Sequence, residues 1–389
     1  MPRSRFAQHV PPFHVMALLA RAQALAAEGH DVIHLEVGEP DFPTPPAVNQ
    51  AIQQAMNSAP MGYTPAAGLP ALRQAISQYY ADYYDATVPA SRVIVTPGAS
   101  GALQLALAAA INPGDGVLVT DPGYPCNRQF VALVGGVPQP VVLDAARQFR
   151  LAADDLWQAW QPTTRLAMVA SPDNPSGNVI AVDDLGQMAH GCVQRGGLLL
   201  VDEIYQGLCY QQRPASVLAQ TDQVLVINSF SKYFSMTGWR LGWMVVPDSW
   251  APVIERLAQN LFLAPSTPAQ YGALAAFQDN TLALLEQRRQ VLAARRQTLL
   301  DGLARLGLPV ASAAEGAFYV YVDISRCAED SFVFAQRLLE QAKVAVTPGI
   351  DFGNGHGPAR YIRIAYTCDE ARLRQAMDRL QQFLQSQAS

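Results

Sequence analysis

Between about residues 92 and 247, short apolar runs alternate with stretches that have a helical pattern. The runs are 92–96, 117–120, 166–170, 198–201 and 224–227, and most of them are continuously apolar. Strands that are covered on both faces have this pattern, because neither face meets water. The alternation therefore predicts an α/β fold with a mainly parallel sheet and helices on both of its faces.

The rest of the chain predicts further helices and a second unit. Helices are expected at 71–81, 101–110 and 281–306, the last with arginines on its outer face. After residue 308 two strand-like runs, 317–322 and 361–366, flank a helix near 331–341 and precede a final helix. We therefore predict a large domain over residues 46–285 and a smaller α+β domain made of residues 1–45 and 286–389.

Charge and cysteine content exclude several classes of partner. The 389 residues carry a formal charge of −5 and no basic run, so neither nucleic acid nor an anionic membrane is an expected partner. No apolar run approaches about 18 residues, and the first ten residues do not resemble a signal peptide. The five cysteines form no C-x-x-C pair and no metal-ligand spacing. A cytoplasmic protein without a metal site is expected.

Lysine is scarce, which narrows the search for a nucleophilic amine. Lys232 and Lys343 are the only lysines, and arginine cannot supply this chemistry because it stays protonated. Lys232 follows a predicted strand, so it should face the crevice in which open α/β sheets bind ligands. Ser229, Ser231 and Arg240 lie close to it in sequence, and hydroxyls with a guanidinium suit a phosphate dianion.

Three other segments place polar groups at predicted strand ends. Asp202 ends an apolar run, and a carboxylate there can keep a buried ring nitrogen protonated, although it can also simply cap a helix. The turn 171–177 is rich in Asn, Pro and Gly. Segment 96–103 passes from a strand into a helix and points free N–H groups at an anion. It lacks the dinucleotide glycine fingerprint and the P-loop lysine.

Taken together, these motifs resemble the class I/II aminotransferases, a fold-type I family that depends on pyridoxal 5'-phosphate. The resemblance covers nearly the whole chain, and its specificity lies in the order and spacing of segments 38–43, 63–69, 121–125, 174–177, 202–205, 229–242 and 361–364. It implies a ping-pong transfer of an amino group from an α-amino acid to a 2-oxo acid.

The resemblance also implies a role for each matching residue. Lys232 would carry the cofactor as a Schiff base and move the substrate proton, while Asp202 would pair with the ring nitrogen. Tyr205 and Asn174 would bind the 3-oxygen of the ring. The ring faces would meet Tyr124 and Ile204, and the phosphate would meet Ala99, Ser100, Ser229, Ser231 and Arg240.

For the substrate, the resemblance implies that Arg363 grips the α-carboxylate with help from Asn174 and the backbone of Gly38. Family members are homodimers with active sites at the interface, and Tyr63 matches the residue that reaches the phosphate of the partner. The segment 12–16 would fold back beside the substrate. His14, within it, is more often a structural residue.

The same cofactor also supports other chemistry after a shared carbanion. A C–S β-lyase and a cyclising enzyme of the aminocyclopropane-carboxylate synthase type remain alternatives. A remote alternative is a non-catalytic regulator that binds the cofactor. Aspartate-specific branches carry a lysine at the position of Ser100 or an arginine just before the loop 261–266, and neither cation is present. Neutral, apolar or aromatic side chains are therefore the predicted substrates.

Overall fold

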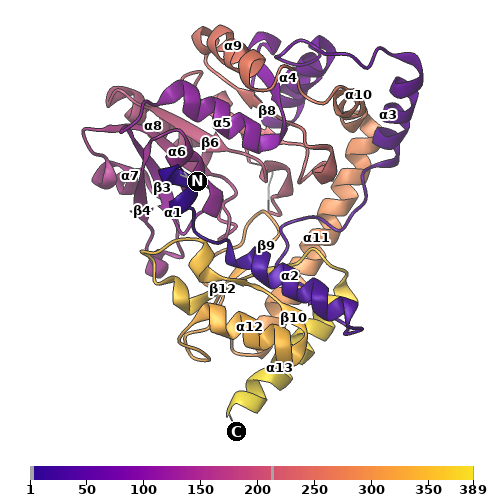
Figure 1. Cartoon of the computed structure of the whole chain (residues 1–389), viewed down its shortest axis with the longest axis vertical. Coiled ribbons are helices and arrows are strands. Elements are labelled where there is room, and N and C mark those ends of the chain that lie inside the picture. Colours follow the sequence, from indigo (N-terminus) through magenta and orange to yellow (C-terminus); the bar gives the residue numbers. More distant parts are fainter. Residues whose placement is uncertain (1–3, 212–213, 389) are drawn as a thin grey trace.

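The computed structural model describes residues 4–211 and 214–388, and a seven-stranded sheet forms its larger part (Figure 1). The strand order is β2-β8-β7-β6-β5-β3-β4. The strands are β2 (Val93–Thr96), β3 (Gly116–Asp121), β4 (Val137–Val142), β5 (Thr164–Ala170), β6 (Leu198–Asp202), β7 (Leu225–Ser229) and β8 (Gly242–Val245). Only β8 runs antiparallel to its neighbours within this sheet, so the prediction of a mainly parallel sheet is confirmed.

Each face of this sheet covers a separate buried core. Val93 and Val95 belong to one cluster of buried side chains, whereas Ile94 between them belongs to the other. Successive side chains of a strand point to opposite faces, so continuous apolar runs are needed to fill both cores. The helices of this part are α3 (Pro46–Ser58), α4 (Pro70–Tyr84), α5 (Gly98–Ala110), α6 (Pro125–Leu133), α7 (Ala153–Ala159), α8 (Val182–Gln194), α9 (Ala251–Leu261) and α10 (Thr267–Ala276).

Two strands of the sheet were not predicted, and each has a local reason. β4 contains Pro138 and Pro140, which lack the N–H that a central strand must donate and are tolerated at an edge. β8 follows directly on the loop that contains Arg240. Its short apolar run was therefore interpreted as part of that loop motif and not as a strand. At the opposite edge, the N–H of Val95 in β2 donates to the carbonyl of Ala67 at 3.0 Å.

The chain ends and the segment after α11 (Asp279–Arg305) form the second part of the molecule. It contains an antiparallel sheet in the order β11 (Thr347–Pro348), β12 (Tyr361–Ala365), β9 (Tyr319–Asp323). The other elements are α1 (Arg5–His9), α2 (His14–Ala27), β1 (Ile33–His34), α12 (Ser331–Ala342), β10 (Val344–Ala345) and α13 (Glu370–Ala388). In Figure 1, α11 connects the upper and lower parts of the molecule, and α2 packs against β10, β11 and α12 in the lower part.

β1 pairs in parallel with β10, which joins the N-terminal segment to the C-terminal part. The predicted domain boundary near residue 285 falls inside α11, a continuous helix of 27 residues. The division at 45 and 285 therefore remains a prediction.

The expectation that the arginines of α11 lie on its outer face is wrong for Arg295. Its side chain is only 8% exposed, and its guanidinium donates to both carboxylate oxygens of Asp41 at 2.7 and 3.0 Å. It also donates to the carbonyl of Thr367 at 2.9 Å. The helix packs against both α10 and α13, so more than one of its faces is covered. In the described part of the chain, no helix combines the length and apolarity needed to span a bilayer.

Candidate active site

A cavity of about 330 Å³ opens where several strands of the large sheet end. The predicted site residues that line it are Gly38, Ala99, Ser100, Tyr124, Asn174, Asp202, Ile204, Tyr205, Ser229, Ser231, Lys232, Arg240 and Arg363. The carboxyl ends of parallel strands meet at one edge of a sheet, which explains why β5, β6 and β7 deliver three of these segments together. Tyr63 is the predicted residue that does not line the cavity.

Lys232 lies three residues after the end of β7 and reaches across the cavity. Its Nζ donates to the carbonyl of Gly38 at 2.6 Å. Burial lowers the pKa of Lys232 to about 8, because the charged ammonium loses hydration, and the nearby charges of Arg363 and Arg240 act in the same direction. A much larger fraction of this amine is neutral near pH 7 than for an exposed lysine, and a neutral amine is the nucleophilic form.

Asp202 ends β6 and presents a carboxylate to the same cavity. One of its oxygens accepts the N–H of Ile204 at 3.1 Å. Burial raises the pKa of Asp202 to about 7, although the charge of Lys232 opposes this shift. Across residues 4–211 and 214–388, no ion pair involves Asp202. A buried carboxylate of this kind is matched by a cationic N–H group on a ligand.

The phosphate end of the cavity is formed by the start of α5 and by the loop after β7. The first N–H groups of α5, at Ala99 and Ser100, have no partner within the helix and carry its positive end. Arg240 donates to the Ser231 hydroxyl at 3.5 Å. A Cβ on Gly242 would lie 2.9 Å from the nitrogen of Ala99, so only glycine permits this close approach.

Arg363 of β12 marks the opposite end and is buried. Its guanidinium donates to Oδ1 of Asn174 at 2.9 Å and to the carbonyl of Glu36 at 2.8 Å. It also lies 4.0 Å from the centre of the Tyr319 ring. Its Nε is buried and has no hydrogen-bond partner among the described residues. Since an unpaired buried N–H is costly, this arginine is suited to a carboxylate ligand.

Sequence reasoning missed Tyr319, which lines the cavity and connects its two ends. Its hydroxyl lies 3.0 Å from the hydroxyl of Tyr205, while its ring contacts Arg363. A Cβ on Gly38 would collide with the Tyr319 hydroxyl, so that glycine makes room for it. The run 317–322 was predicted as a strand. Tyr319 and Tyr321 are two residues apart and share one face of β9, so tertiary packing along that face decides that Tyr319 lines the cavity while the Tyr321 hydroxyl contacts His356.

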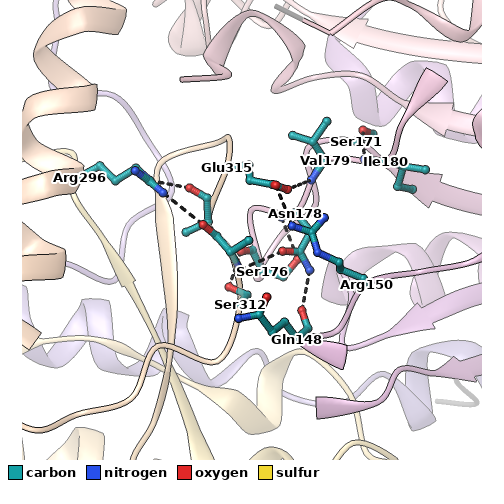
Figure 2. A network of polar contacts seen from close by, with 12 residues as sticks. Gln148, Arg150, Ser171, Ser176, Asn178, Val179, Ile180, Arg296, Ser312 and Glu315 are labelled. Atoms are coloured by element: carbon teal, nitrogen blue, oxygen red, sulfur yellow. Dashed lines mark hydrogen bonds and ion pairs between the residues drawn. The ribbon is translucent and has the colours of Figure 1, made fainter. Parts of the chain in front are cut away.

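A polar network fixes the segment before β9 to the loop after β5 (Figure 2). Ser312 donates to the carbonyl of Ser176 at 2.6 Å, and the N–H of Ala313 donates to Asn178 at 3.2 Å. Glu315 accepts from Arg150 at 2.7 Å and from the N–H of Val179 at 3.1 Å. The strand that carries Tyr319 and the loop that carries Asn174 are therefore held in one arrangement.

The start of α2 forms an apolar wall of the cavity. The sequence did not identify the individual residues of this wall. Phe13, Val15, Met16 and Leu19 line the cavity. The expectation that the segment 12–16 returns to the site thus agrees with the structure. His14 is not among the lining residues, and its ring packs 4.8 Å from that of Phe332, as a structural residue would.

Known proteins with this architecture are numerous. The family model for aminotransferase class I and II matches residues 30–380. The chain is 36% identical over 381 residues to a valine–pyruvate aminotransferase of Mycobacterium tuberculosis, which covers 97% of each chain. A solved aminotransferase from M. tuberculosis superimposes with a TM-score of 0.95 at 34% identity, covering 99% of this chain and 100% of that one.

This chain belongs to the class I and II aminotransferase family. A Thermus thermophilus aspartate aminotransferase with maleate is also similar, with a TM-score of 0.92 and 33% identity over 98% of this chain and 100% of that one. The protein is a transaminase that uses pyridoxal 5'-phosphate, as the family does. The predicted family, fold class, enzyme class and cofactor are therefore confirmed. In the described residues, no group of three or more metal-ligating side chains is found.

The residues present fit this cofactor. Its pyridine ring, when bound, withdraws electrons from the substrate bond that breaks. Asp202 has no cationic partner among the described residues, and a protonated ring nitrogen would provide one. Lys232 is a half-buried amine with a lowered pKa. The α5 start and Arg240 offer N–H donors for a dianion.

Proposed function

We propose that this aminotransferase acts on α-amino acids with neutral or apolar side chains and uses Lys232 as its cofactor-linked lysine. The observation that carries the proposal is the composition of one cavity, in which Lys232, Asp202 and Arg363 meet the apolar start of α2. An amine, a carboxylate and a guanidinium are the three groups that attachment, ring protonation and carboxylate binding require. The apolar wall leaves a place for an apolar side chain.

Within this proposal Lys232 would hold the cofactor and would also move the proton of the substrate Cα. Asp202 keeps the ring nitrogen protonated, and Tyr205 with Asn174 binds the ring 3-oxygen. Asn174 uses its oxygen for Arg363, which leaves its amide N–H groups for that acceptor. Tyr124 and Ile204 line the same cavity and would cover the two faces of the bound cofactor ring.

The phosphate is bound by the N–H groups of Ala99 and Ser100, the hydroxyls of Ser229 and Ser231, and the guanidinium of Arg240. Arg363 and the backbone of Gly38 bind the substrate α-carboxylate. Two observations support these roles. The residues line the same cavity, and the buried Nε of Arg363 has no hydrogen-bond acceptor among the described residues.

The substrate class rests on the charges of the cavity. Its cationic lining residues are Lys232, Arg240 and Arg363, and the proposal assigns all three to the cofactor or to the α-carboxylate. A second carboxylate would be buried without a cation, at a cost of several kcal/mol. The relatives' names do not decide this point, since one is a valine–pyruvate aminotransferase and another an aspartate aminotransferase.

We also propose that the enzyme is a homodimer whose active sites lie at the interface. Tyr63 is 85% exposed, and Met61, Leu261 and Leu263 are exposed apolar side chains near it in sequence or across the fold. Thr267 donates to the carbonyl of Gly62 at 2.7 Å, so the segments around residues 62 and 265 are neighbours. An exposed apolar patch is typical of an interaction surface, and a second copy would bring Tyr63 to the phosphate of its partner.

A cytoplasmic location completes the proposal. All five cysteines are free, and two of them, Cys192 and Cys209, are buried. Free thiols in this number suit a reducing compartment.

The decisive experiment is a panel of amino acids added to the purified holoenzyme without a 2-oxo acid. Conversion of the cofactor absorbance to that of its amine form should be fast for leucine, phenylalanine and alanine and slow for aspartate. Aspartate leading this set by about tenfold or more would contradict the substrate class. Release of pyruvate from cysteine conjugates in the same assay would instead indicate β-elimination.

A further inference from the structure

The helix that forms the apolar wall of the cavity is not capped by its own neighbours. Phe13 is the N-cap residue of α2 and makes no side-chain capping bond. Instead, one carboxylate oxygen of Asp351 accepts the N–H of His14 at 3.0 Å, and the other accepts the N–H of Val15 at 2.9 Å. The first turn of α2 is therefore bound by a residue 337 positions away in the chain.

Asp351 is itself held in place by the large sheet. It ends a short 3-10 turn, Gly349–Asp351, and the segment that follows it is bound by Asp121 at the end of β3. One Asp121 oxygen accepts the N–H groups of Asn354 and Gly355, each at 2.9 Å, and the other pairs with His356. A Cβ on Gly353 would collide with this carboxylate, so the segment passes closely over it.

The connection ends at the cavity. Val15, whose N–H is bound by Asp351, lines the cavity, as do Phe13, Met16 and Leu19 from the same turns of α2. Asp351 itself does not line the cavity. Asp351 can therefore influence substrates through the position of α2. The charge of Asp351 also acts on Arg363, but an effect on that residue would be shared by all substrates with an α-carboxylate.

We propose that Asp351 is a positioning residue for substrate selection, which fixes α2 so that its apolar side chains contact the substrate side chain. This inference rests on the proposed apolar substrate class. When the two hydrogen bonds are lost, α2 separates from the cavity more often, and an apolar side chain loses contact area. A substrate with a short side chain loses little, because it reaches the wall least.

The test compares Asp351→Ala with Asp369→Ala. Asp369 is a matched control, because its carboxylate accepts the N–H of Arg372 at 2.9 Å at the start of α13, and it does not line the cavity. In Asp351→Ala, kcat/KM for leucine should fall by about tenfold, equivalent to about 1.4 kcal/mol, while that for alanine should change by less than about twofold. Asp369→Ala should leave the ratio of leucine to alanine unchanged. An equal fall for both amino acids in Asp351→Ala would overturn the proposal.

Hydrogen exchange of residues 14–19 provides a readout that is independent of activity. It should be faster in Asp351→Ala than in the wild type and unchanged in Asp369→Ala. Asp351→Asn, which keeps the shape and one acceptor oxygen, guards against misfolding and should give an intermediate exchange rate. Unchanged exchange in both Asp351 variants would overturn the proposal that Asp351 holds α2 in place.

The two proposals fail in different ways. A wild-type preference for aspartate would overturn the substrate class proposed above. Exchange in α2 would still decide the role of Asp351, because faster exchange in Asp351→Ala but not in Asp369→Ala supports that role, and equal exchange overturns it.

Discussion

The two sides of the active-site cavity are built in different ways. On the cofactor side, Asp202 and Lys232 follow the ends of adjacent strands β6 and β7 of one sheet. On the substrate side, Arg363 comes from β12, Tyr319 from β9 and the apolar wall from α2. The first set takes its position from the strand order. The second set is assembled by hydrogen bonds between residues that are far apart in sequence.

This difference suggests a division of labour. The reacting groups lie on a sheet that is buried on both faces, where a shift of position is costly. The residues proposed to contact the substrate lie on a smaller sheet and on a helix whose first two N–H groups donate to the Asp351 carboxylate. We expect changes on the cofactor side to lower turnover more than changes on the substrate side do.

The largest effect should follow Lys232→Ala, which removes the proposed attachment point on the cofactor side. Activity should fall by about a thousandfold or more, because both the nucleophile and the proton carrier are lost. Borohydride reduction followed by peptide mapping should find cofactor on a peptide containing residue 232 in the wild type and none there in the variant. Lys343→Ala, at the C-cap of α12, is the control and should behave as wild type. Cofactor fixed on Lys343 in either protein would contradict the assignment.

Leu261→Arg tests whether the active site is complete within one chain or needs residues from a second copy. A charge buried without a partner in an interface costs several kcal/mol, so the dimer dissociation constant should rise by about a hundredfold or more. Sedimentation should detect the monomer, and activity should fall with it. Leu133→Arg is a matched control, since the two leucines are 53% and 51% exposed. An active monomer would show that the sites are complete within one chain.

Asp202→Asn should lower turnover by about tenfold or more, because the neutral amide cannot keep the ring nitrogen protonated. Cofactor affinity should change less than turnover, since phosphate contacts remain. Measured kcat and the cofactor dissociation constant separate the two quantities. A turnover change below about tenfold would show that Asp202 does not have this role.

In the cofactor-free protein, Asp202→Asn should raise thermal stability rather than impair the protein. Burial raises the pKa of Asp202 from 3.8 to about 7, so the folded state binds its proton more tightly than the unfolded state does. The stability due to this proton is present below about pH 4 and is lost as the pH rises to about 7. Asp202→Asn should therefore unfold at a higher temperature than the wild type at pH 8, with a smaller difference at pH 5. An unchanged difference would contradict the raised pKa.

The smallest effect should follow Tyr319→Phe on the substrate side. The variant keeps the ring that contacts Arg363 and loses the hydroxyl bonded to Tyr205. One hydrogen bond of this kind contributes about 1 kcal/mol, so kcat/KM should fall by about fivefold. The pH at which the absorbance of the bound cofactor changes should also rise, because Tyr205 becomes a weaker donor. Tyr321→Phe, whose hydroxyl contacts His356 instead, is the control and should leave this absorbance titration unchanged.

The sequence was informative where neighbours in the chain are also neighbours in the site. Lys232, Ser229 and Ser231 share one strand end, so spacing alone predicted their proximity. Arg363 was assigned through a family motif, since its contact with Asn174 spans 189 residues.

Tyr319 and Asp351 could not be assigned in the same way. Tyr319 and Tyr321 share one face of β9, so which of them lines the cavity depends on how that face packs. The N–H groups of α2 reach Asp351 only because the chain ends pack together. Arg295 shows the converse error, because a charged residue on a helix was expected to face water and is instead buried in an ion pair with Asp41.

The edges of the large sheet also limit how copies of this protein can assemble. Pro138 and Pro140 leave β4 without two of its donors, and Ala67 already occupies the N–H of Val95 in β2. Neither border offers an uninterrupted row of N–H donors, which disfavours the joining of sheets from successive molecules edge to edge. Association through the helices and loops near Tyr63 can instead close after two copies, since a twofold axis uses the same patch on both. The proposed dimer would cover these apolar side chains, while the sheet borders disfavour further growth.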